Sequence, residues 1–203
     1  MLDSIDIKKI EDADNNYTVY HLHSMLSNGV TNIDSITSYK EYIAYAQSLG
    51  MKALAFAEHG CIFEWVHKKQ EIEKAGMKYI HAIEAYITND KNIEDKHRDN
   101  YHCVLIAKNY DGVKELNKLV STSFNRQDIH YYYTPRMTFE ELYNTSDNIL
   151  ITTACIGGVI AKADNEQHAE NRYYEDLAEV PKVRKELDVE LEKMKLKPRF
   201  LSF

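Results

Sequence analysis

Strand-like and helix-like segments alternate along this chain, and this alternation restricts the fold more than any other feature. Runs rich in β-branched, aromatic and aliphatic residues predict strands over residues 17–23, 51–60, 77–88, 101–109 and 148–158. Apolar residues at helical spacing predict helices over residues 36–49, 63–76 and 113–120. The pattern is typical of a parallel α/β fold, in which functional sites collect at the C-terminal ends of the strands.

The composition indicates a folded globular protein without strong affinity for nucleic acid. The chain has 203 residues, of which 44% are hydrophobic, and carries a net charge of -7. That charge argues against bulk electrostatic binding of DNA, so DNA would be handled locally or through a partner. The cysteines, Cys61, Cys103 and Cys155, are odd in number and widely spaced, which indicates reduced thiols. Without a signal peptide or an apolar run of roughly 20 residues, we predict a cytoplasmic protein that does not contact a membrane.

The two ends of the chain differ from its middle. Residues 1–16 are polar and acidic, and we predict a leader with little fixed structure there. The folded domain is placed at residues 17–203. Within its last segment, residues 164–203, a helix is predicted from Pro181 and four apolar residues, Val183, Leu187, Leu191 and Met194. We assign no role to that segment.

Two histidines mark the end of the first predicted strand, in the sequence "YHLHS". His21 and His23 are two residues apart, and residues i and i+2 of a strand face the same side. One metal ion could therefore bind both imidazoles. The alternative is that they are ordinary surface or core histidines, because an H-x-H pair alone is a weak signal.

Further residues of metal-binding type lie at the ends of other predicted strands. They are His59 in "AEHG", Glu84 in "IEAY", His102 in "YHCVLIAKN" and Cys155 in "TTACIGG". Imidazole, carboxylate and thiolate suit zinc, and imidazole with carboxylate also suits manganese or iron. In the alternative, Glu84 is a solvated strand end, His102 is half-buried against backbone and Cys155 is a small buried hydrophobe. Glu58 could orient a neighbouring imidazole. No site role is expected for the remaining histidines, His67, His81, His97, His130 and His168.

The order of these motifs resembles the PHP (polymerase and histidinol phosphatase) domain. The phrases H-x-H-S, "AEHG", "IEAY", "YHCVLIAKN" and "TACIGG" follow one another as they do in that family. "LIAKNYDGVKELNKLVS" and "YYYTPRMTFEELY" are similar to the PHP domains at the N-terminus of bacterial DNA polymerase III alpha subunits. The similarity covers about residues 20–160.

The resemblance implies a distorted (β/α)7 barrel with up to three divalent metal ions, zinc, manganese or iron, at the C-terminal strand ends. It implies metal ligands at His21, His23, Asp34, His59, Glu84, His102 and Cys155, and catalytic roles for His21, His23, His59 and Glu84. The family's first acidic ligand would fall at Val30. Asp34 comes into register instead if "SNGV" is a four-residue insertion. Glu84 corresponds to the carboxylate that bridges two ions.

One family motif is missing from this sequence. The family closes its site with Asp-x-His near the end of the domain, whereas the only histidine after Cys155 is His168 in "NEQHAEN". Either the domain is cut short at its C-terminus, or the last ligands are lost. The site formed by Glu84, His102 and Cys155 would be least affected.

Three functions follow from the resemblance. The first is a metal-dependent phosphoesterase that removes nucleotides from the 3′ end of DNA during replication, which the intact H-x-H favours. The second is a catalytically silent module that stabilises a polymerase body or docks a proofreading subunit, which the missing Asp-x-His favours. The third is a free-standing phosphomonoesterase similar to histidinol phosphatase, against which the polymerase-like phrases count.

Overall fold

The computed structural model describes residues 17–30, 33, 35–92, 100–162 and 200–201. Asp34, the 1–16 leader and nearly all of the 164–203 segment, with its predicted helix, lie outside these residues. The helices are η2 (Met25–Gly29, 3-10), α2 (Tyr39–Ser48), α3 (Trp65–Lys74), α4 (Tyr110–Ser123) and α5 (Phe139–Tyr143). The strands are β1 (Ala53–Phe56), β2 (Lys78–Thr88), β3 (Tyr101–Ala107), β4 (Tyr131–Tyr132), β5 (Thr134–Pro135), β6 (Met137–Thr138), β7 (Ile149–Thr153) and β8 (Phe200–Leu201).

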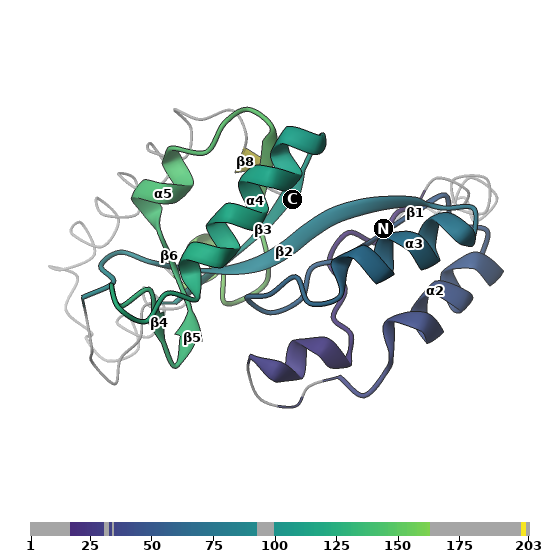
Figure 1. The fold of residues 1–203 in the computed structure, drawn as a ribbon, viewed down its shortest axis with the longest axis horizontal. Helices are drawn as coiled ribbons and strands as arrows, with labels where there is room; N and C mark the ends of the chain where they lie inside the picture. Colours follow the sequence, from purple (N-terminus) through teal and green to yellow (C-terminus); the bar gives the residue numbers. More distant parts are fainter. Residues whose placement is uncertain (1–16, 31–32, 34, 93–99, 163–199, 202–203) are drawn as a thin grey trace, which may run out of the picture.

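The main sheet is built around the long strand β2. Its strand order is β1-β2-β3-β7-β8, and β6 also pairs with β2. Strand β2 runs along the long axis of the molecule, with α2 and α3 towards one end and α4 and α5 towards the other (Figure 1). Among the described residues the sheet is open, because β1 and β8 at its two ends do not pair with each other. The mixed α/β class is therefore confirmed, while the barrel stays a prediction.

The prediction of a parallel sheet is wrong for its centre. Strand β2 pairs in parallel with β1 and β6, but β3 runs antiparallel to both β2 and β7. A parallel pair needs a crossover connection, usually through a helix, whereas an antiparallel partner needs only a return of the chain. The sequence has an amphipathic pattern between β1 and β2, but the charged segment between β2 and β3 has none. The absence of a helical pattern between β2 and β3 was therefore the feature of the sequence that could have predicted an antiparallel pair.

Helix α2 is shorter than its apolar spacing predicted. Ser38 and Glu41 form a capping box, in which each side chain bonds the backbone of the other, so the helix begins at Tyr39. Ile36, which fits the helical spacing, precedes the cap and is 89% exposed. The helix ends at Ser48, with Leu49 as its C-cap and the left-handed Gly50 following. The caps, rather than the apolar period, therefore set its length.

The predicted strand at residues 17–23 is an extended segment with one isolated bridge, from Val19 to Leu54 of β1. Two backbone hydrogen bonds hold it in place, because Val19 O and Leu22 O accept from Ala55 N and Ala57 N. The segment therefore lies along β1 without forming a regular ladder. This contact fixes where the H-x-H motif emerges.

Strand β2 is buried on both faces, which separates the core from the site. Ile83, Ala85 and Ile87 lie on one face and belong to a core cluster shared with α4 and β7. Glu84 and Tyr86 alternate with them and lie on the opposite face. None of the helices within the described residues has the length and apolar character needed to cross a membrane.

Gly60 allows β5 to approach the segment that follows β1, and we expect Gly60→Ala to be more destabilising than Gly76→Ala. Both glycines have positive φ, so each alanine costs about 1 kcal/mol in backbone strain. At Gly60 a Cβ would also lie 2.7 Å from Cγ of Pro135, whereas at Gly76 it meets nothing within 4 Å. Overpacking of this kind adds roughly 1–3 kcal/mol. Urea unfolding midpoints measure the difference. Equal losses of unfolding free energy in the two variants would show that Pro135 moves away from a Cβ at position 60 without cost.

Candidate metal centre

The centre is organised around the carboxylate of Glu84. This residue lies inside β2, not at its end as predicted, because the strand continues to Thr88. Its side chain is 1% exposed, so the alternative of a solvated strand end does not apply. Oε1 lies 3.0 Å from His102 Nδ1, and Oε2 lies 2.6 Å from His59 Nδ1. His21 Nε2 and His23 Nε2 are 3.6 and 3.4 Å from the same carboxylate.

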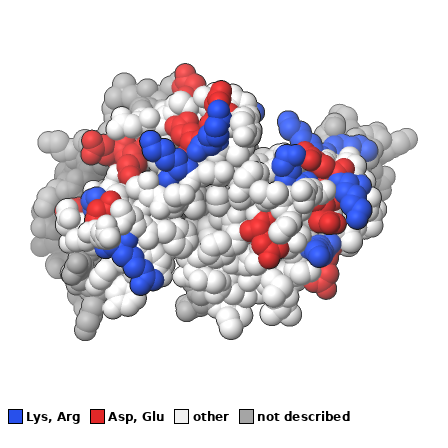
Figure 2. Space-filling view, in the orientation of Figure 1, with Lys and Arg blue, Asp and Glu red and all other residues white. Residues whose placement is uncertain are grey.

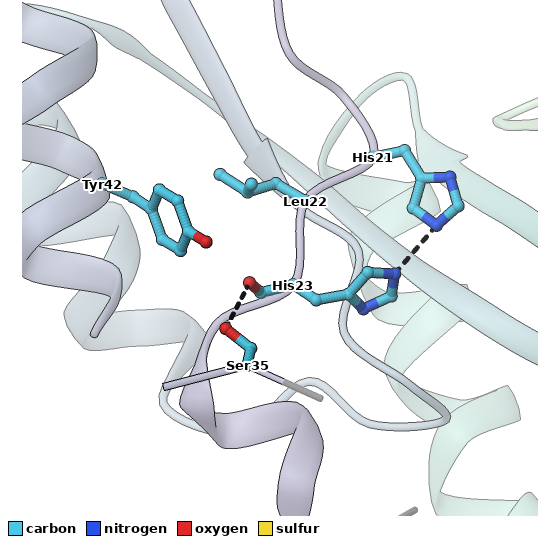
Figure 3. A pocket seen from close by; sticks show the side chains of 5 residues that line it. All are labelled: His21, Leu22, His23, Ser35 and Tyr42. Carbon is cyan, nitrogen blue, oxygen red and sulfur yellow. Dashed lines mark hydrogen bonds between the residues drawn. The ribbon is translucent and has the colours of Figure 1, made fainter. Parts of the chain in front are cut away.

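His21 and His23 reach Glu84 from the extended segment beside β1. Their rings lie on the same side of the chain, while Leu22 points the other way, towards Tyr42 (Figure 3). This is the two-residue alternation expected of extended backbone. The two Nε2 atoms are 3.0 Å apart. Two nitrogens bound to one zinc ion at roughly 2.0–2.1 Å would have about this separation.

Backbone pairing aligns His59 with Glu84. His59 follows β1 and forms an isolated parallel bridge with Glu84, in which Gly60 N donates to Glu84 O at 2.8 Å. The register of β1 and β2 therefore places the two side chains together. The His59 ring stacks on that of His23, with centroids 4.0 Å apart.

His102 and Cys155 approach Glu84 from the opposite side. His102 is on β3, diagonal to Glu84 across the antiparallel pair. An isolated bridge between His102 and Gly158 brings the segment after β7 alongside. Cys155 Sγ then lies 3.4 Å from His102 Nδ1 and 3.7 Å from Glu84 Oε1. Cys155 is exposed and all three cysteines are free thiols, so its alternative role as a buried hydrophobe is wrong.

The structure thus brings together six of the seven residues predicted as ligands: His21, His23, His59, Glu84, His102 and Cys155. Asp34 lies outside the described residues, and its role stays a prediction. The described histidines without an expected site role lie elsewhere. His67 is on the surface of α3, His81 bonds Tyr79 and Asn117, and His130 contacts Asp128 and Glu141.

The charges at the centre are strongly coupled. Burial alone would raise the pKa of Glu84, but hydrogen bonds with His102, His21 and His59 outweigh it and hold that pKa well below its usual range. Burial, together with the nearby His59, lowers the pKa of His23 to about 4. Glu84 is therefore a carboxylate and His23 a neutral imidazole at neutral pH.

The donor set fits a divalent cation. In the part of the chain that the structure describes, two groups have donor atoms that all lie within 4.8 Å of one another: His21, His23 and Glu84, and Glu84, His102 and Cys155. Glu84 Oε2 is buried, and imidazole nitrogens of His59 and His23 lie 2.6 and 3.4 Å from it. Converging lone pairs of nitrogen, oxygen and sulfur suit zinc, or manganese and iron where nitrogen and oxygen predominate. Because Glu84 belongs to both groups, it could bridge two ions.

An open pocket lies beside the H-x-H motif. It has a volume of about 310 Å³ and is lined by His21, Leu22, His23, Ser35 and Tyr42. Ser35 Oγ donates to the backbone oxygen of His23 at 3.2 Å, which connects the segment before α2 to the motif (Figure 3). The pocket therefore adjoins two of the candidate ligands, His21 and His23.

Sequence reasoning missed two residues at the centre, Tyr86 and Ser27, and it named Glu58 as a carboxylate that could orient an imidazole. Tyr86 was missed because a tyrosine within an apolar strand is expected to be a core aromatic. Its ring centroid lies 4.8 Å from that of His102 and 6.1 Å from that of His59. Ser27 is missed although it bonds His23 Nδ1 at 3.1 Å. The only available signal was a hydroxyl four residues after His23. Glu58 reaches the imidazoles through Ser27, because Ser27 Oγ donates to its carboxylate at 2.6 Å.

Comparison with known proteins identifies the family. The family model described as the PHP domain matches residues 20–193, which is most of the chain. The chain belongs to the PHP family. The resemblance predicted from the motif order is therefore confirmed.

Relatives of this PHP chain are DNA polymerase III alpha subunits. It is 34% identical over 146 residues to the protein of Borreliella burgdorferi and 31% identical over 159 residues to that of Helicobacter pylori strain 26695. These matches cover 70% and 78% of this chain but only 12% and 13% of the relatives. A solved, provisionally named metal-dependent phosphoesterase from Bifidobacterium adolescentis has a TM-score of 0.34 and 15% identity, covering 54% of this chain and 35% of that one. That likeness is too distant to say anything about this chain.

We expect replacement of His21 and His23 by alanine to lower metal content while leaving the fold intact. The two side chains supply two of the three donors of one group, and both are only partly buried. Elemental analysis after loading with zinc or manganese measures the loss, and circular dichroism checks the fold. His67→Ala on the α3 surface is the matched control. Unchanged metal content in the double variant would exclude this group as a site.

Cys155 should be the cysteine that reacts first with iodoacetamide, and bound zinc should protect it. Burial raises the pKa of Cys61 to about 11 and that of Cys103 to about 12, so neither forms thiolate readily. Burial also raises the pKa of Cys155, and its alkylation should therefore accelerate as the pH rises above 8. Mass spectrometry after timed labelling identifies the modified cysteine. Equal labelling rates with and without zinc would show that this thiol is not a ligand.

Proposed function

We propose that this PHP chain is a metal-dependent phosphoesterase domain that cleaves phosphodiester bonds at the 3′ end of DNA. One observation carries the proposal: a single buried carboxylate, Glu84, belongs to both groups of candidate ligands. A carboxylate shared by two ions is the arrangement of paired-metal phosphoesterases. Membership of the PHP family agrees with this chemistry.

Each group of side chains would have its own part. Bound divalent ions, up to three and of zinc, manganese or iron, would supply an activated water and neutralise phosphoryl charge. His21 and His23 would hold one side of the centre, and His102 and Cys155 the other. His59 would contribute an imidazole against Glu84 Oε2, where their atoms lie 2.6 Å apart. Asp34 is proposed as a further ligand.

DNA would be held mainly by the ions or by a partner. The net charge is -7, and the face shown in Figure 2 has acidic and basic side chains mixed at both ends with a largely uncharged band between them. No continuous basic groove crosses that face of the described residues. The similarity to DNA polymerase III alpha subunits suggests a polymerase body or a proofreading subunit as that partner.

A second candidate is a catalytically silent docking module. The observation that favours it is the absence of an Asp-x-His motif after Cys155. Without these two ligands, two of the three sites would each lack a donor. The site of Glu84, His102 and Cys155 would still bind an ion, and its role would then be structural.

We expect weak phosphodiesterase activity from this chain, dependent on added manganese or zinc. The assay uses a chromogenic phosphodiester, a short single-stranded DNA labelled at its 5′ end and a phosphomonoester in parallel. His59→Ala should remove the activity because it deletes a donor facing Glu84. His67→Ala, exposed and remote from Glu84, is the control and should change nothing.

The outcomes separate the candidate functions. Progressive shortening of the labelled DNA from its 3′ end supports the exonuclease. Hydrolysis of the phosphomonoester alone would favour a free-standing phosphatase. Metal binding without turnover of any substrate, also in a longer chain carrying an Asp-x-His, would contradict the phosphoesterase and leave the docking module.

A further inference from the structure

A buried polar network lies directly behind the candidate ligands. The Glu58 carboxylate, 1% exposed, accepts from Ser24 N at 2.8 Å, from Ser27 Oγ at 2.6 Å and from Lys68 Nζ at 2.6 Å. The Ser24 hydroxyl donates to it as well. A carboxylate offers about four lone-pair sites, so these four donors saturate it. The network is therefore complete without any imidazole in direct contact with Glu58.

Ser27 connects this network to two of the histidines. Its hydroxyl has one proton and two lone pairs, and the proton is committed to Glu58. One lone pair accepts from the backbone N–H of His59 at 3.1 Å. The other faces His23 Nδ1 at 3.1 Å. Because Ser27 has no second proton to donate, His23 Nδ1 must be the donor.

We propose that Ser27, held by the Glu58–Lys68 pair, is a positioning residue that fixes His23 as its Nδ1–H tautomer. The Nε2 lone pair of His23 is then directed at His21 and Glu84, where its atoms lie 3.0 and 3.4 Å away. A hydrogen bond to one ring nitrogen determines which nitrogen is left to bind a metal. The consequence for metal binding rests on the proposed function, whereas the tautomer itself does not.

Burial makes this arrangement specific. Ser24 and Ser27 are both fully buried and Lys68 is 2% exposed, so water does not compete for their hydrogen bonds. Lys68 extends from α3. Ser24 is the N-cap of the short 3-10 helix η2, and Ser27 lies within that helix. The pair of charges thus joins three segments: the turn after the H-x-H motif, the end of β1 and helix α3. A rigid support at this point sets the orientation of the His23 ring relative to β2.

Nitrogen-15 NMR of the full metal-free chain tests the tautomer directly. His23 is assigned by the signal that disappears in His23→Asn. We expect a protonated Nδ1 and an unprotonated Nε2 in the unsubstituted protein near pH 7.5. A protonated Nε2 with an unprotonated Nδ1 would overturn the proposal, whatever the behaviour of any variant.

Ser27→Ala and Ser24→Ala form a matched pair of substitutions. Both serines are buried and both donate to Glu58, but only the hydroxyl of Ser27 lies within hydrogen-bond distance of the His23 ring. In Ser27→Ala we expect the Nε2–H tautomer of His23 to appear and zinc affinity to fall about 10–100-fold. In Ser24→Ala we expect the His23 signals to stay as in the unsubstituted protein. Zinc affinity should change by no more than about two-fold, well below the loss that follows when a hydrogen-bond partner of a metal ligand is removed.

Zinc titration by calorimetry, with thermal unfolding in parallel, separates the outcomes. Equal loss of affinity in the two variants, in proportion to their loss of stability, would show that the network only supports the fold and would overturn the positioning role. If the unsubstituted chain binds no metal but shows the Nδ1–H tautomer, the proposed function fails and the role of Ser27 in fixing the ring stands. If Ser27→Ala does not fold, the spectrum of the unsubstituted protein still decides.

Discussion

Glu84 carries a carboxylate that is 1% exposed in the middle of β2, and an uncompensated charge at that depth costs several kcal/mol. The structure offsets this cost with hydrogen bonds to three imidazoles, from His21, His59 and His102. Each comes from a separate position in the fold, so the burial of one acidic group requires β1, β3 and the N-terminal segment to meet at β2. The same requirement creates the candidate metal centre.

A second buried charge supports the first. Glu58 precedes His59 by one residue and is neutralised by Lys68 from α3. Removing one partner of such a pair costs about 3–5 kcal/mol, because the other is left charged and unpaired. The pair therefore ties α3 to the end of β1, and through Ser27 it holds the ring of His23. Two buried acidic residues, Glu84 in β2 and Glu58 just after β1, thus place the histidines together.

The sheet shows where sequence reasoning succeeded and where it failed. The strands were located because strand-forming residues gather in short runs, and β2, β3 and β7 lie within the predicted segments. Their direction was assigned wrongly, because strand order and direction depend on the connections rather than on the strands themselves. Ile36 was misplaced for a similar reason, since a local capping box at Ser38 overrides the apolar spacing. In the helix a local capping box, and in the sheet the pairing of distant strands, decided the structure against the periodic pattern.

The sequence by itself determined the residue types of the site and their family, because H-x-H, "AEHG", "IEAY", "YHC" and "TACIGG" occur in a distinctive order. It also determined that His21 and His23 face one side, since extended backbone alternates with a period of two. Only the tertiary structure decided that Glu84 is buried at the centre and that Cys155 is exposed beside His102. It also decided that Ser27 lies between Glu58 and His23 and hydrogen-bonds both. These features depend on strand register and on contacts between residues up to 71 positions apart, which no local pattern encodes.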